Sequence, residues 1–596
     1  MSDFSLPLDK PSKPPVINIY CSSKETSLDE ADKNFKKLKS ILCLCLNTDQ
    51  YVIYHLKPNQ LFSDPWEHNT ELLIVSSDCN EQEPNNVLSE LIQKYLATGG
   101  KVLCFGASIL HFDFVERKPS AHNSSFTWNF TKMEYQGKVM MVPVISDVSL
   151  TSSKLSLVPF NVLGKQENEP KLPLVISMSN SENGILILSQ AALDKDPTDF
   201  LSSKETFASL QSHNSVRFEV LQDLMSARLG LDSSAPQLPL LTSATLLSAE
   251  KNRKKELLHA LSCKLHGSNL LIGASVSLQL VESQKDVMHP ISAQCLPLII
   301  QEKEDKDVQF QFFTPKEYWE NLQTKSLGQL LLYVDVVPTT MPLLYPLITK
   351  NYPQAGLVAI AGRQTSGRGR GGNQWISPPG CAMFTLHVCL DASSALGQAP
   401  TFLQHFCGLA MVLSVRELPG YEDINIEIKW SNDIVFNNCI KLGGVLVDSY
   451  TEEGKLHAFI GAGLNVSNHN PTMCINDLIK LENKMRILNG MDVLPELSKE
   501  KIISRTITTF EQIMAKFNSK GPGDFENLLY KYWIHKNINK FSLETENGKN
   551  IDVKVCGLDS QGHLSVIEEK EQKQISLNSL QYSMDVKQRL IFKKRT

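Results

Sequence analysis

A short segment rich in glycine and arginine, residues 362–372, is the strongest candidate for chemistry in this sequence. It has the sequence GRQTSGRGRGG, with five glycines and three arginines among eleven residues. Glycine lets another backbone or a ligand approach closely, and consecutive N–H groups of such a segment can form a nest that binds anions. Arg368 and Arg370 add a permanent, forked positive charge that matches phosphate oxygens. The composition therefore predicts a loop that handles phosphate or pyrophosphate.

Three other interpretations of this loop remain open from composition alone. The separation of Gly362 and Gly367 matches a P-loop, but Arg368 and Gly369 stand where that motif has lysine and Ser/Thr. An RGG-type nucleic-acid segment is the second interpretation, which a single copy in a chain of net charge -5 supports poorly. The third is a plain flexible loop. A phosphate-binding loop is favoured over all three.

Three further segments carry polar groups beside glycines or an aromatic residue. KWSND spans residues 429–433, KLGGVLV begins at Lys441, and GAGLN spans residues 461–465. Taken singly, each has an ordinary structural explanation: Trp430 as a core residue, Asn–Asp as a turn, and Lys441 as a solvated strand end. The paired glycines after Lys441 would nevertheless let a ligand or another backbone come close.

The order of these motifs resembles the catalytic domain of biotin–protein ligases. PTT (338–340), GRGRGG followed by a tryptophan, KW-ND, K-GG and G-x-G-x-N follow one another between about residues 330 and 469 in the family's order and spacing. The flanking segments are similar to the animal branch of the family, the holocarboxylase synthetases. The resemblance implies an enzyme that activates biotin with ATP as biotinyl-5'-AMP, releases pyrophosphate, and transfers biotin to a specific lysine ε-amine of biotin-dependent carboxylases.

The resemblance also implies roles for individual residues. The implied catalytic cations are Arg368, Arg370 and Lys441. The implied biotin site contains these three cations and four further residues: Thr339, Thr340, Gln364 and Gly367. The implied ATP site comprises Trp375, Asn432, Asp433 and Asn465, and Asp433 is also the candidate ligand of Mg²⁺. Two positions depart from the family: Ser431 replaces the usual proline, and Asn373 stands where the bacterial enzymes carry another arginine.

Cofactors and partners follow from the same resemblance. ATP and Mg²⁺ are the implied cofactors, and biotin is a substrate. The implied acceptors are the apo forms of acetyl-CoA, pyruvate, propionyl-CoA and methylcrotonyl-CoA carboxylases. A lipoate–protein ligase, which shares the fold and the reaction logic, and a catalytically inactive scaffold remain as alternatives. Direct, sequence-specific nucleic-acid binding is not expected, because the N-terminal region has an α/β pattern and is not basic.

The elements expected to position these residues alternate between strands and helices. Strands are predicted around the catalytic motifs at 329–337, 356–362, 381–390, 424–430, 432–436, 441–450 and 456–466. Helices are predicted at 341–351, 401–418, 498–518 and 524–534. Upstream, apolar runs at 16–21, 38–46, 70–77 and 101–107 with a helix at 85–100 indicate an α/β unit, and a further helix is predicted at 242–265.

The fold class expected is therefore a multidomain α/β and α+β protein. Residues 1–15 are expected to be a disordered tail and residues 16–240 an α/β domain. The family resemblance implies that this domain is glutamine-amidotransferase-like, although the sequence around Cys104 lacks the catalytic cysteine motif of such enzymes. Residues 241–325 are expected to connect to the catalytic domain, with a charged hinge at 302–307. The catalytic domain is expected at 326–536, with a mixed sheet and helices, and an SH3-like β-barrel at 537–596.

Composition narrows the class of protein. Hydrophobic residues make up 42% and charged residues 21% of the 596 residues, which is typical of globular domains. The 13 cysteines form no CxxC pair, which favours free thiols in a reducing compartment. The N-terminal sequence predicts neither a secretory signal nor a transit peptide, and no apolar run is long enough for a membrane span. A cytoplasmic location is expected, with mitochondria left open as a second compartment.

Overall fold

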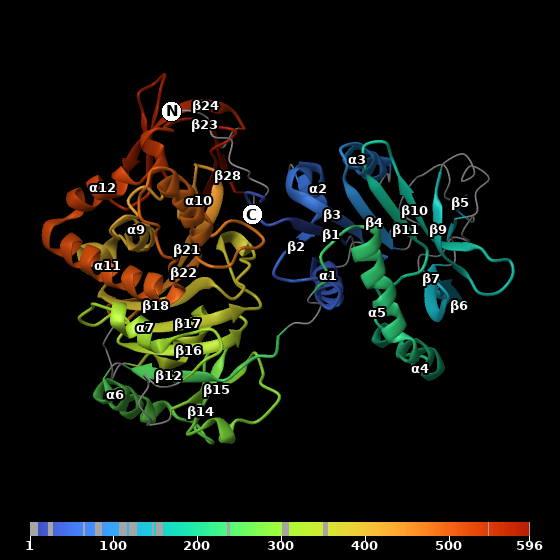
Figure 1. Ribbon diagram of the computed structural model, residues 1–596, viewed down its shortest axis with the longest axis horizontal. Coiled ribbons are helices and arrows are strands. Elements are labelled where there is room, and N and C mark those ends of the chain that lie inside the picture. The colour runs from blue at the N-terminus through green and yellow to red at the C-terminus, as the bar shows by residue number, and fades with distance from the viewer. Residues whose placement is uncertain are drawn as a thin grey trace. The chain divides into compact units, whose positions relative to one another are not determined.

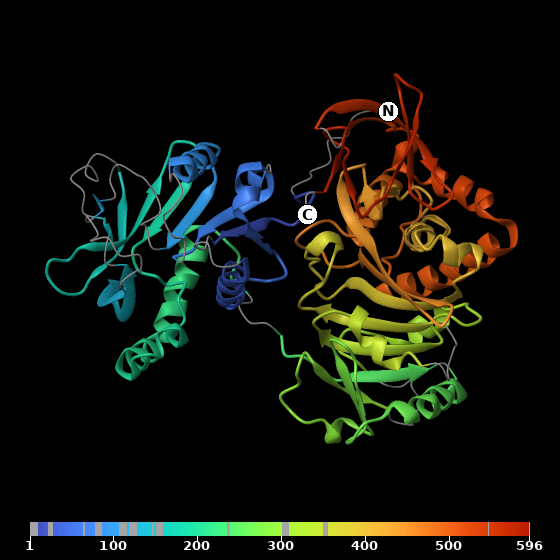
Figure 2. The ribbon, with the colours of Figure 1, turned by 180° about the vertical axis from the view of Figure 1, so that it is seen from behind.

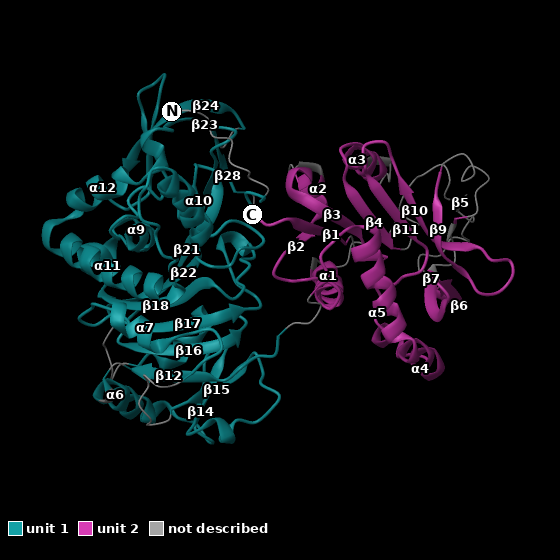
Figure 3. Ribbon diagram, viewed as in Figure 1, with its two compact units in different colours: residues 1–13, 239–596 teal, residues 14–238 magenta. Residues whose placement is uncertain are grey.

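The chain divides into two compact units (Figure 3). Residues 14–238, drawn in magenta, are called the first unit because they come first in the chain, and residues 1–13 with 239–596, drawn in teal, are called the second unit. The computed structural model describes most of both units. The described residues are 10–21, 28–63, 66–77, 86–105, 116–117, 128–145, 148–150, 159–234, 239–248, 250–300, 309–349, 356–545 and 548–594. The predicted hinge at 302–307 and the first nine residues of the predicted tail lie outside this described part.

The first unit is built on a nine-stranded sheet whose first half is parallel and whose second half is antiparallel (Figure 1). The strands, in their order across the sheet, are β2 (Val52–Leu56), β1 (Val16–Tyr20), β3 (Thr70–Val75), β4 (Lys101–Phe105), β11 (Ile185–Ser189), β10 (Pro173–Ser179), β9 (Asn161–Gln166), β6 (Trp128–Tyr135) and β7 (Lys138–Ile145). A separate two-stranded ribbon joins β5 (Glu116–Arg117) and β8 (Val148–Ser149). The predicted α/β pattern is confirmed for this unit.

Helices cover both faces of this sheet because each carries an apolar stripe. Leu38 of α1 and Val220 of α5 share one core with Ile17 of β1, whereas Ile92 of α3 packs with Val102 of β4 in a second core. The helices are α1 (Leu28–Cys43), α2 (Pro58–Ser63), α3 (Asn86–Ala97), α4 (Lys204–Ser212) and α5 (Asn214–Asp223), with single turns η1 (Trp66–Asn69), η4 (Pro197–Phe200) and η5 (Leu224–Arg228). The strand expected at 38–46 is wrong, because this run is the apolar side of α1 and the turn after it.

The second unit contains an eleven-stranded mixed sheet (Figures 1 and 2). Its strands, in spatial order, are β13 (Leu270–Leu271), β14 (Ser277–Val281), β15 (Cys295–Ile299), β12 (Ala244–Ser248), β16 (Leu330–Val337), β17 (Leu357–Gln364), β18 (Cys381–Asp391), β22 (Lys455–Asn465), β21 (Ile440–Glu452), β20 (Asp433–Phe436) and β19 (Ile426–Lys429). The seven strands predicted around the motifs are confirmed, and their ends carry the candidate site residues.

The run LLLYVDVV of β16 explains why the centre of this sheet is buried on both faces. Leu331 and Tyr333 belong to the core on one face, and Leu332 and Val334 to the core on the other. Successive side chains of a strand point to opposite faces, so a continuous apolar run is what a doubly covered strand requires. Helices α9 (Phe402–Arg416) and α11 (Lys499–Lys520) pack together and against strands of the first face.

Strands β12 to β15 show that residues 241–300 do more than connect two domains. β12 is antiparallel to β16 over five residue pairs, from Ala244 with Val334 to Ser248 with Leu330. The expected connecting region therefore extends the catalytic sheet. The helix expected over 242–265 is wrong in its first half, because TSATLLS forms β12; the remainder forms α6 (Lys251–Leu261) and the turn η6 (Ser262–Lys264).

The second unit has further helices and single turns in its described part. They are η7 (Gln284–Asp286), α7 (Pro315–Asn321), η8 (Met341–Leu343), η9 (Tyr345–Leu347), η10 (Arg370–Gly372), α8 (Ala395–Gln398), α10 (Ile475–Leu488), α12 (Pro522–Lys531) and η11 (Ile534–Lys536). The continuous helix predicted at 341–351 is wrong. Pro342 and Pro346 lack the N–H that an α-helix needs, and the segment forms the two short 3-10 turns η8 and η9 instead.

The C-terminal residues form a separate six-stranded sheet on the same core. Its strands, in spatial order, are β26 (Gln574–Leu577), β25 (Leu564–Glu568), β24 (Asn550–Leu558), β23 (Lys540–Glu544), β28 (Leu590–Lys593) and β27 (Tyr582–Asp585). Phe541 and Val566 of this sheet share one hydrophobic core with Phe402 of α9. The C-terminal sheet thus packs firmly against the catalytic part of the unit.

The described residues also bear on membrane and redox expectations. No helix in the described part of the chain is both long and apolar enough to cross a membrane. None of the twelve cysteines of the described segments forms a disulfide, and seven of them are buried. Cys104 of β4 is one of these seven, and its side chain is fully buried in a hydrophobic core.

Candidate active site

The end of β16 and the end of β17 are tied together by the predicted biotin-site residues. The Thr340 N–H donates to Gln364 Oε1 at 2.9 Å, and Gln364 Nε2 donates to Ser377 Oγ at 3.0 Å. Thr340 Oγ1 lies 2.8 Å from Thr385 Oγ1 of β18, and Thr339 is buried beside it. β16 and β17 are parallel, so their carboxyl ends bring Thr340 and Gln364 together although 24 residues separate them. Thr385 is a partner that the sequence did not reveal.

The Gly/Arg loop folds back on itself as a narrow hairpin. The Trp375 N–H donates to Gly367 O at 2.9 Å, and the Gly369 N–H donates to Asn373 O at 2.7 Å. A Cβ on Gly367 would lie 2.4 Å from Trp375 O, so the two arms can approach this closely only with glycine. Gly371, at the tip, has a φ of +62°, which also favours glycine. The glycines thus allow the loop to form an ordered hairpin.

The two predicted arginines of the loop have different surroundings. Arg368 is exposed, whereas Arg370 is half-buried and its Nη1 donates to Ser579 O at 3.2 Å. Lys594 Nζ donates to the same carbonyl at 2.7 Å. Burial lowers the pKa of Arg370, and the charge of Asp433 partly offsets that effect. The C-terminal sheet therefore holds one loop arginine and brings a second cation, Lys594, which the sequence did not single out.

Lys441 and Asp433 form the electrostatic centre of the site. Lys441 Nζ lies 2.7 Å from Asp433 Oδ1, and Lys429 Nζ lies 3.9 Å from Asp433 Oδ2. Burial alone would raise the pKa of Asp433, but Lys441, Lys429 and Arg370 outweigh burial and lower the pKa below its usual value. The carboxylate is charged, and the cations around it exceed it in number.

Trp375 and the glycines of two neighbouring strands form the floor beside this ion pair. Lys441 Nζ lies 5.6 Å from the centroid of the Trp375 ring, within the range of a cation–π contact. Gly444 of β21 pairs with Gly463 of β22, and a Cβ on Gly463 would lie 2.7 Å from Trp375 Nε1. The K-GG and G-x-G motifs therefore meet across two paired strands, and the glycine at 463 makes room for the indole.

The KWSND turn is held by buried groups from distant segments. The Trp430 N–H donates to His535 Nε2 at 3.0 Å, and Asn432 Nδ2 donates to Val445 O. Ser431 Oγ donates to Asn432 Oδ1 at 3.1 Å, so the serine at the family's usual proline position has a hydrogen bond of its own. The peptide bond between Trp430 and Ser431 is cis. His535 fixes this turn from a position about a hundred residues away, where no sequence motif indicated it.

Asn465 lies at the end of β22, and its amide group is fully engaged by the next loop. Its Nδ2 donates to Thr472 Oγ1 at 3.0 Å and to Met473 O at 3.3 Å, and its Oδ1 accepts from Asn468 Nδ2 at 2.9 Å. These contacts assign it a structural role in the loop between β22 and α10. Its predicted contact with ATP stays a prediction.

The arrangement as a whole suits a polyanionic ligand. Lys441, Lys429 and Arg370 act on the carboxylate of Asp433, Lys594 lies near Arg370, and Arg368 is exposed on the same loop as Arg370. Two unit charges about 4 Å apart interact by about 4 kcal/mol at the effective dielectric of a protein surface, so several cations acting together attract a triphosphate strongly. Trp375 and Gly463 lie beside these charges.

Known proteins resemble this chain along almost all of its length. Residues 333–465 match the biotin/lipoate A/B protein ligase family. A Homo sapiens protein named biotin–protein ligase is 34% identical over 586 residues, which cover 98% of this chain and 78% of the human protein. The bifunctional ligase/repressor BirA of Bacillus subtilis is 28% identical over 244 residues, 41% of this chain and 71% of BirA. The solved biotin protein ligase of Aquifex aeolicus in complex with biotin and ATP aligns with a TM-score of 0.30 and 23% identity, over 42% of this chain and 96% of its own.

The family match covers β16 to β22, the same segment in which the loop, the ion pair and the glycine floor come together. Together with the identity that extends over 98% of the sequence, this shows that the chain belongs to the biotin–protein ligase family.

Proposed function

We propose that the Gly/Arg loop, Lys441 and Asp433 form the active site in which this chain acts as a biotin–protein ligase. The enzyme activates biotin with ATP to biotinyl-5'-AMP and pyrophosphate, and then transfers biotin to a protein lysine. The observation that carries the assignment of the site is the convergence of three cations, Lys441, Lys429 and Arg370, on Asp433. This excess positive charge lies beside a glycine floor in the segment that the family shares.

The first half-reaction joins two anions, so its main barrier is electrostatic. The biotin carboxylate must attack the α-phosphate of ATP, and two negative charges about 4 Å apart repel by about 4 kcal/mol in this environment. Lys441 and Arg370 offset that repulsion and stabilise the charge that develops on the α-phosphate and the leaving pyrophosphate. Arg368, which is exposed, is free to close onto the bound ligand with the loop and to exclude water from the anhydride.

Other residues orient the two substrates. Thr339, Thr340 and Gln364 form a rigid polar group at the ends of β16 and β17 that can hold the ureido group of biotin by hydrogen bonds. Trp375 presents its ring beside Lys441, where the adenine can stack. Asn432 and Asn465 support the turn and the loop on the nucleotide side, and the glycine at 367 lets the loop approach the ligand.

Asp433 fits the role of one protein ligand of Mg²⁺. Its carboxylate is charged, and its Oδ2 lies 3.9 Å from Lys429 Nζ, beyond hydrogen-bond distance. Mg²⁺ in such enzymes is bound by one or two carboxylates together with the substrate phosphates, and it neutralises charge on the triphosphate. The lowered pKa makes Asp433 a weak base, so the acceptor lysine is expected to arrive already deprotonated in the second half-reaction.

The biological setting is proposed from the family. The acceptors would be the apo forms of acetyl-CoA, pyruvate, propionyl-CoA and methylcrotonyl-CoA carboxylases, in the cytoplasm and in mitochondria. The first unit, whose parallel sheet continues into antiparallel strands, would be a glutamine-amidotransferase-like domain without catalysis that recognises the acceptor. The C-terminal sheet would be an SH3-like barrel that supports the loop through the Arg370 contact with Ser579.

Isotope exchange between labelled pyrophosphate and ATP tests the site. Wild-type protein with Mg-ATP should exchange label only when biotin is present, and lipoate in its place should give none. Arg370→Ala should reduce the exchange rate by about two orders of magnitude, because a charge that acts mainly in the transition state is lost. Asn373→Ala, an exposed position on the same loop, is the matched control and should stay within about twofold of wild type.

Two results would contradict the proposal. Biotin-independent exchange, or none at all from folded protein, would remove the ligase assignment. Equal rates for Arg370→Ala and Asn373→Ala would leave the reaction in place but remove the loop from it.

A further inference from the structure

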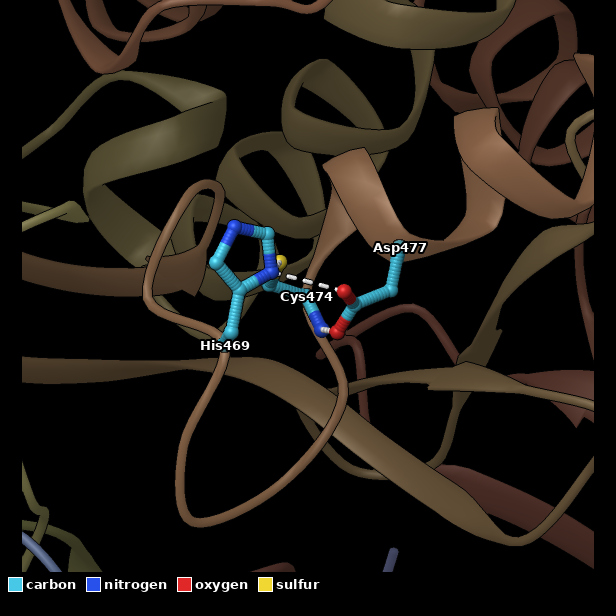
Figure 4. Close-up of side chains that lie close together, drawn as sticks. All are labelled: His469, Cys474 and Asp477. Carbon is cyan, nitrogen blue, oxygen red and sulfur yellow. Dashed lines mark hydrogen bonds and ion pairs between the residues drawn. The ribbon is translucent and has the colours of Figure 1, made fainter. Parts of the chain in front are cut away.

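A second group of charged and polar side chains lies in the loop between β22 and α10, outside the residues of the proposed mechanism. His469, Cys474 and Asp477 point toward one another there (Figure 4). Each offers one ligand atom, and the three atoms lie within 4.8 Å of one another. His469 Nδ1 is 2.7 Å from Asp477 Oδ1 and 3.5 Å from Cys474 Sγ. Imidazole, thiolate and carboxylate together are a ligand set typical of zinc and similar metals.

We propose that His469, Cys474 and Asp477 bind a divalent transition metal ion of the zinc class, with water in the fourth position. A tetrahedral zinc ion with Zn–S of about 2.3 Å and Zn–N of about 2.05 Å places sulfur and nitrogen about 3.6 Å apart. The observed separation of 3.5 Å is close to this value. The nitrogen–oxygen pair must open from 2.7 Å to about 3.3 Å, which a rotation of the exposed histidine ring provides.

The backbone around the three ligands is already ordered. Cys474 is the N-cap of α10, and its N–H donates to Asp477 Oδ2 at 3.2 Å. Asn465 holds the preceding turn through Thr472 and Met473. A metal ion would therefore meet two ligands on the first turn of a fixed helix, and only His469 has to adjust. Because these ligands are ordered before the metal arrives, binding loses less conformational entropy than it would at a disordered site.

The protonation of the ligands defines what binding must change. Burial, followed by the nearby charge of Asp477, raises the pKa of Cys474 to about 12, so the thiol is protonated without metal. Burial would also raise the pKa of Asp477, but hydrogen bonds from Lys10 and His469 outweigh it and lower the pKa. Metal binding must therefore displace the thiol proton, and the ring proton of His469 must move to Nε2, which points away from the cluster in Figure 4.

A cation from a distant part of the chain already lies at this position. Lys10 Nζ is 2.8 Å from Asp477 Oδ2 and donates to His469 O at 2.5 Å. The ammonium group thus indicates that the cluster attracts positive charge and competes with a metal for the same carboxylate. Binding of the metal and docking of Lys10 are expected to oppose each other.

Cobalt(II) titration of the full-length protein tests the proposal, because a cobalt–thiolate bond has a charge-transfer band in the near ultraviolet. Wild type should bind one cobalt ion with this band and release one proton, and zinc should displace the cobalt. Cys474→Ser should abolish the band while serine keeps the N-cap of α10, which separates metal binding from folding. Cys556→Ser, at an exposed cysteine elsewhere, is the matched control and should bind as wild type does.

Lys10→Ala distinguishes this site from surface binding. An exposed ion pair contributes up to about 1 kcal/mol, so removing Lys10 should tighten cobalt binding by about two- to fivefold. No saturable cobalt–thiolate band in wild type, or an equal band in Cys474→Ser, would overturn the proposal. Unchanged affinity in Lys10→Ala would overturn the competition between Lys10 and the metal.

Discussion

Gly367→Ala should impair the first half-reaction because the loop cannot keep its hairpin with a side chain at this position. The added Cβ would lie 2.4 Å from Trp375 O and 2.7 Å from Ser377 Oγ. Ordinary contact requires about 3.4 Å, so the two arms of the loop must separate by about 1 Å. That movement displaces Trp375 from Lys441 and the segment that carries Arg370 from Asp433.

The expected size of the effect follows from that displacement. A misplacement of about 1 Å near reacting groups lowers a rate by about a hundredfold, or about 2.7 kcal/mol in the barrier. Gly371→Ala is the matched control, since a Cβ there has no atom within 4 Å and meets only the cost of a φ of +62°. That cost is about 1 kcal/mol in the conformation of the loop, which corresponds to about fivefold in rate.

Biotin-dependent pyrophosphate exchange, measured as kcat/KM for both variants, separates the two effects. Circular dichroism and thermal unfolding would verify that both proteins keep the fold. The reasoning is refuted if Gly367→Ala exchanges label as fast as wild type. It is equally refuted if Gly371→Ala is the more damaged variant, because steric contact would then not be the cause.

The remaining predictions concern pH and the groups around Asp433. Burial, as the largest cause, lowers the pKa of His405 to about 4 and those of His387 and His535 to about 3, from 6.5. Between these values the folded state binds fewer protons than the unfolded state, so the free energy of unfolding should fall as the pH drops from 6.5 toward 4. The decrease, measured by urea denaturation, should be at most about 1.4 kcal/mol per pH unit for each histidine. A free energy that does not change with pH would contradict this. His535→Ala removes the acceptor of the Trp430 N–H and a buried ring, and should lower the free energy of unfolding by about 2–4 kcal/mol in the same assay; an unchanged midpoint would argue against this contact. Lys441→Met should reduce pyrophosphate exchange by about a hundredfold, whereas Lys455→Met, an exposed position on the neighbouring strand, should not.

Much of the fold around the site could be predicted because its strands are strongly apolar. The run LLLYVDVV and the alternating segment that begins at Cys381 indicate strands from composition alone, and both are confirmed as β16 and β18. The motif residues Trp375, Lys441 and Asp433 do come together, with Lys441 in contact with both others. The proximity of these three residues could be predicted only because the order of the motifs matches a known family. The hydrophobic periodicity of the sequence does not indicate that they lie close together.

Other features had no signal in the sequence. Helix α10 was not predicted, because its buried residues are confined to its first half and Ile487 and Leu488 are exposed at its end. His535 and Lys594 reach the site from segments far along the chain, and long-range contacts of this kind leave no local pattern. Lys10 belongs to the segment expected to be a disordered tail, yet it forms an ion pair with Asp477. The prediction of a helix after Thr340 failed for a local reason. The apolar residues there have helical spacing, but the prolines of the segment prevent a continuous α-helix.

The extension of the catalytic sheet by β12 to β15 determines where the enzyme can be cut. A fragment that begins at residue 326 would leave β16 as an edge strand with unpaired backbone groups. It would also expose the apolar side chains of Leu330, Leu332 and Val334. Long apolar edges pair with other copies and aggregate. A fragment that begins near residue 239 keeps β16 covered, and the sheet then ends at β13, a strand of two residues that offers little for another chain to join. Residues 241–300 therefore prevent self-association through β16, and the smallest soluble ligase fragment should include them.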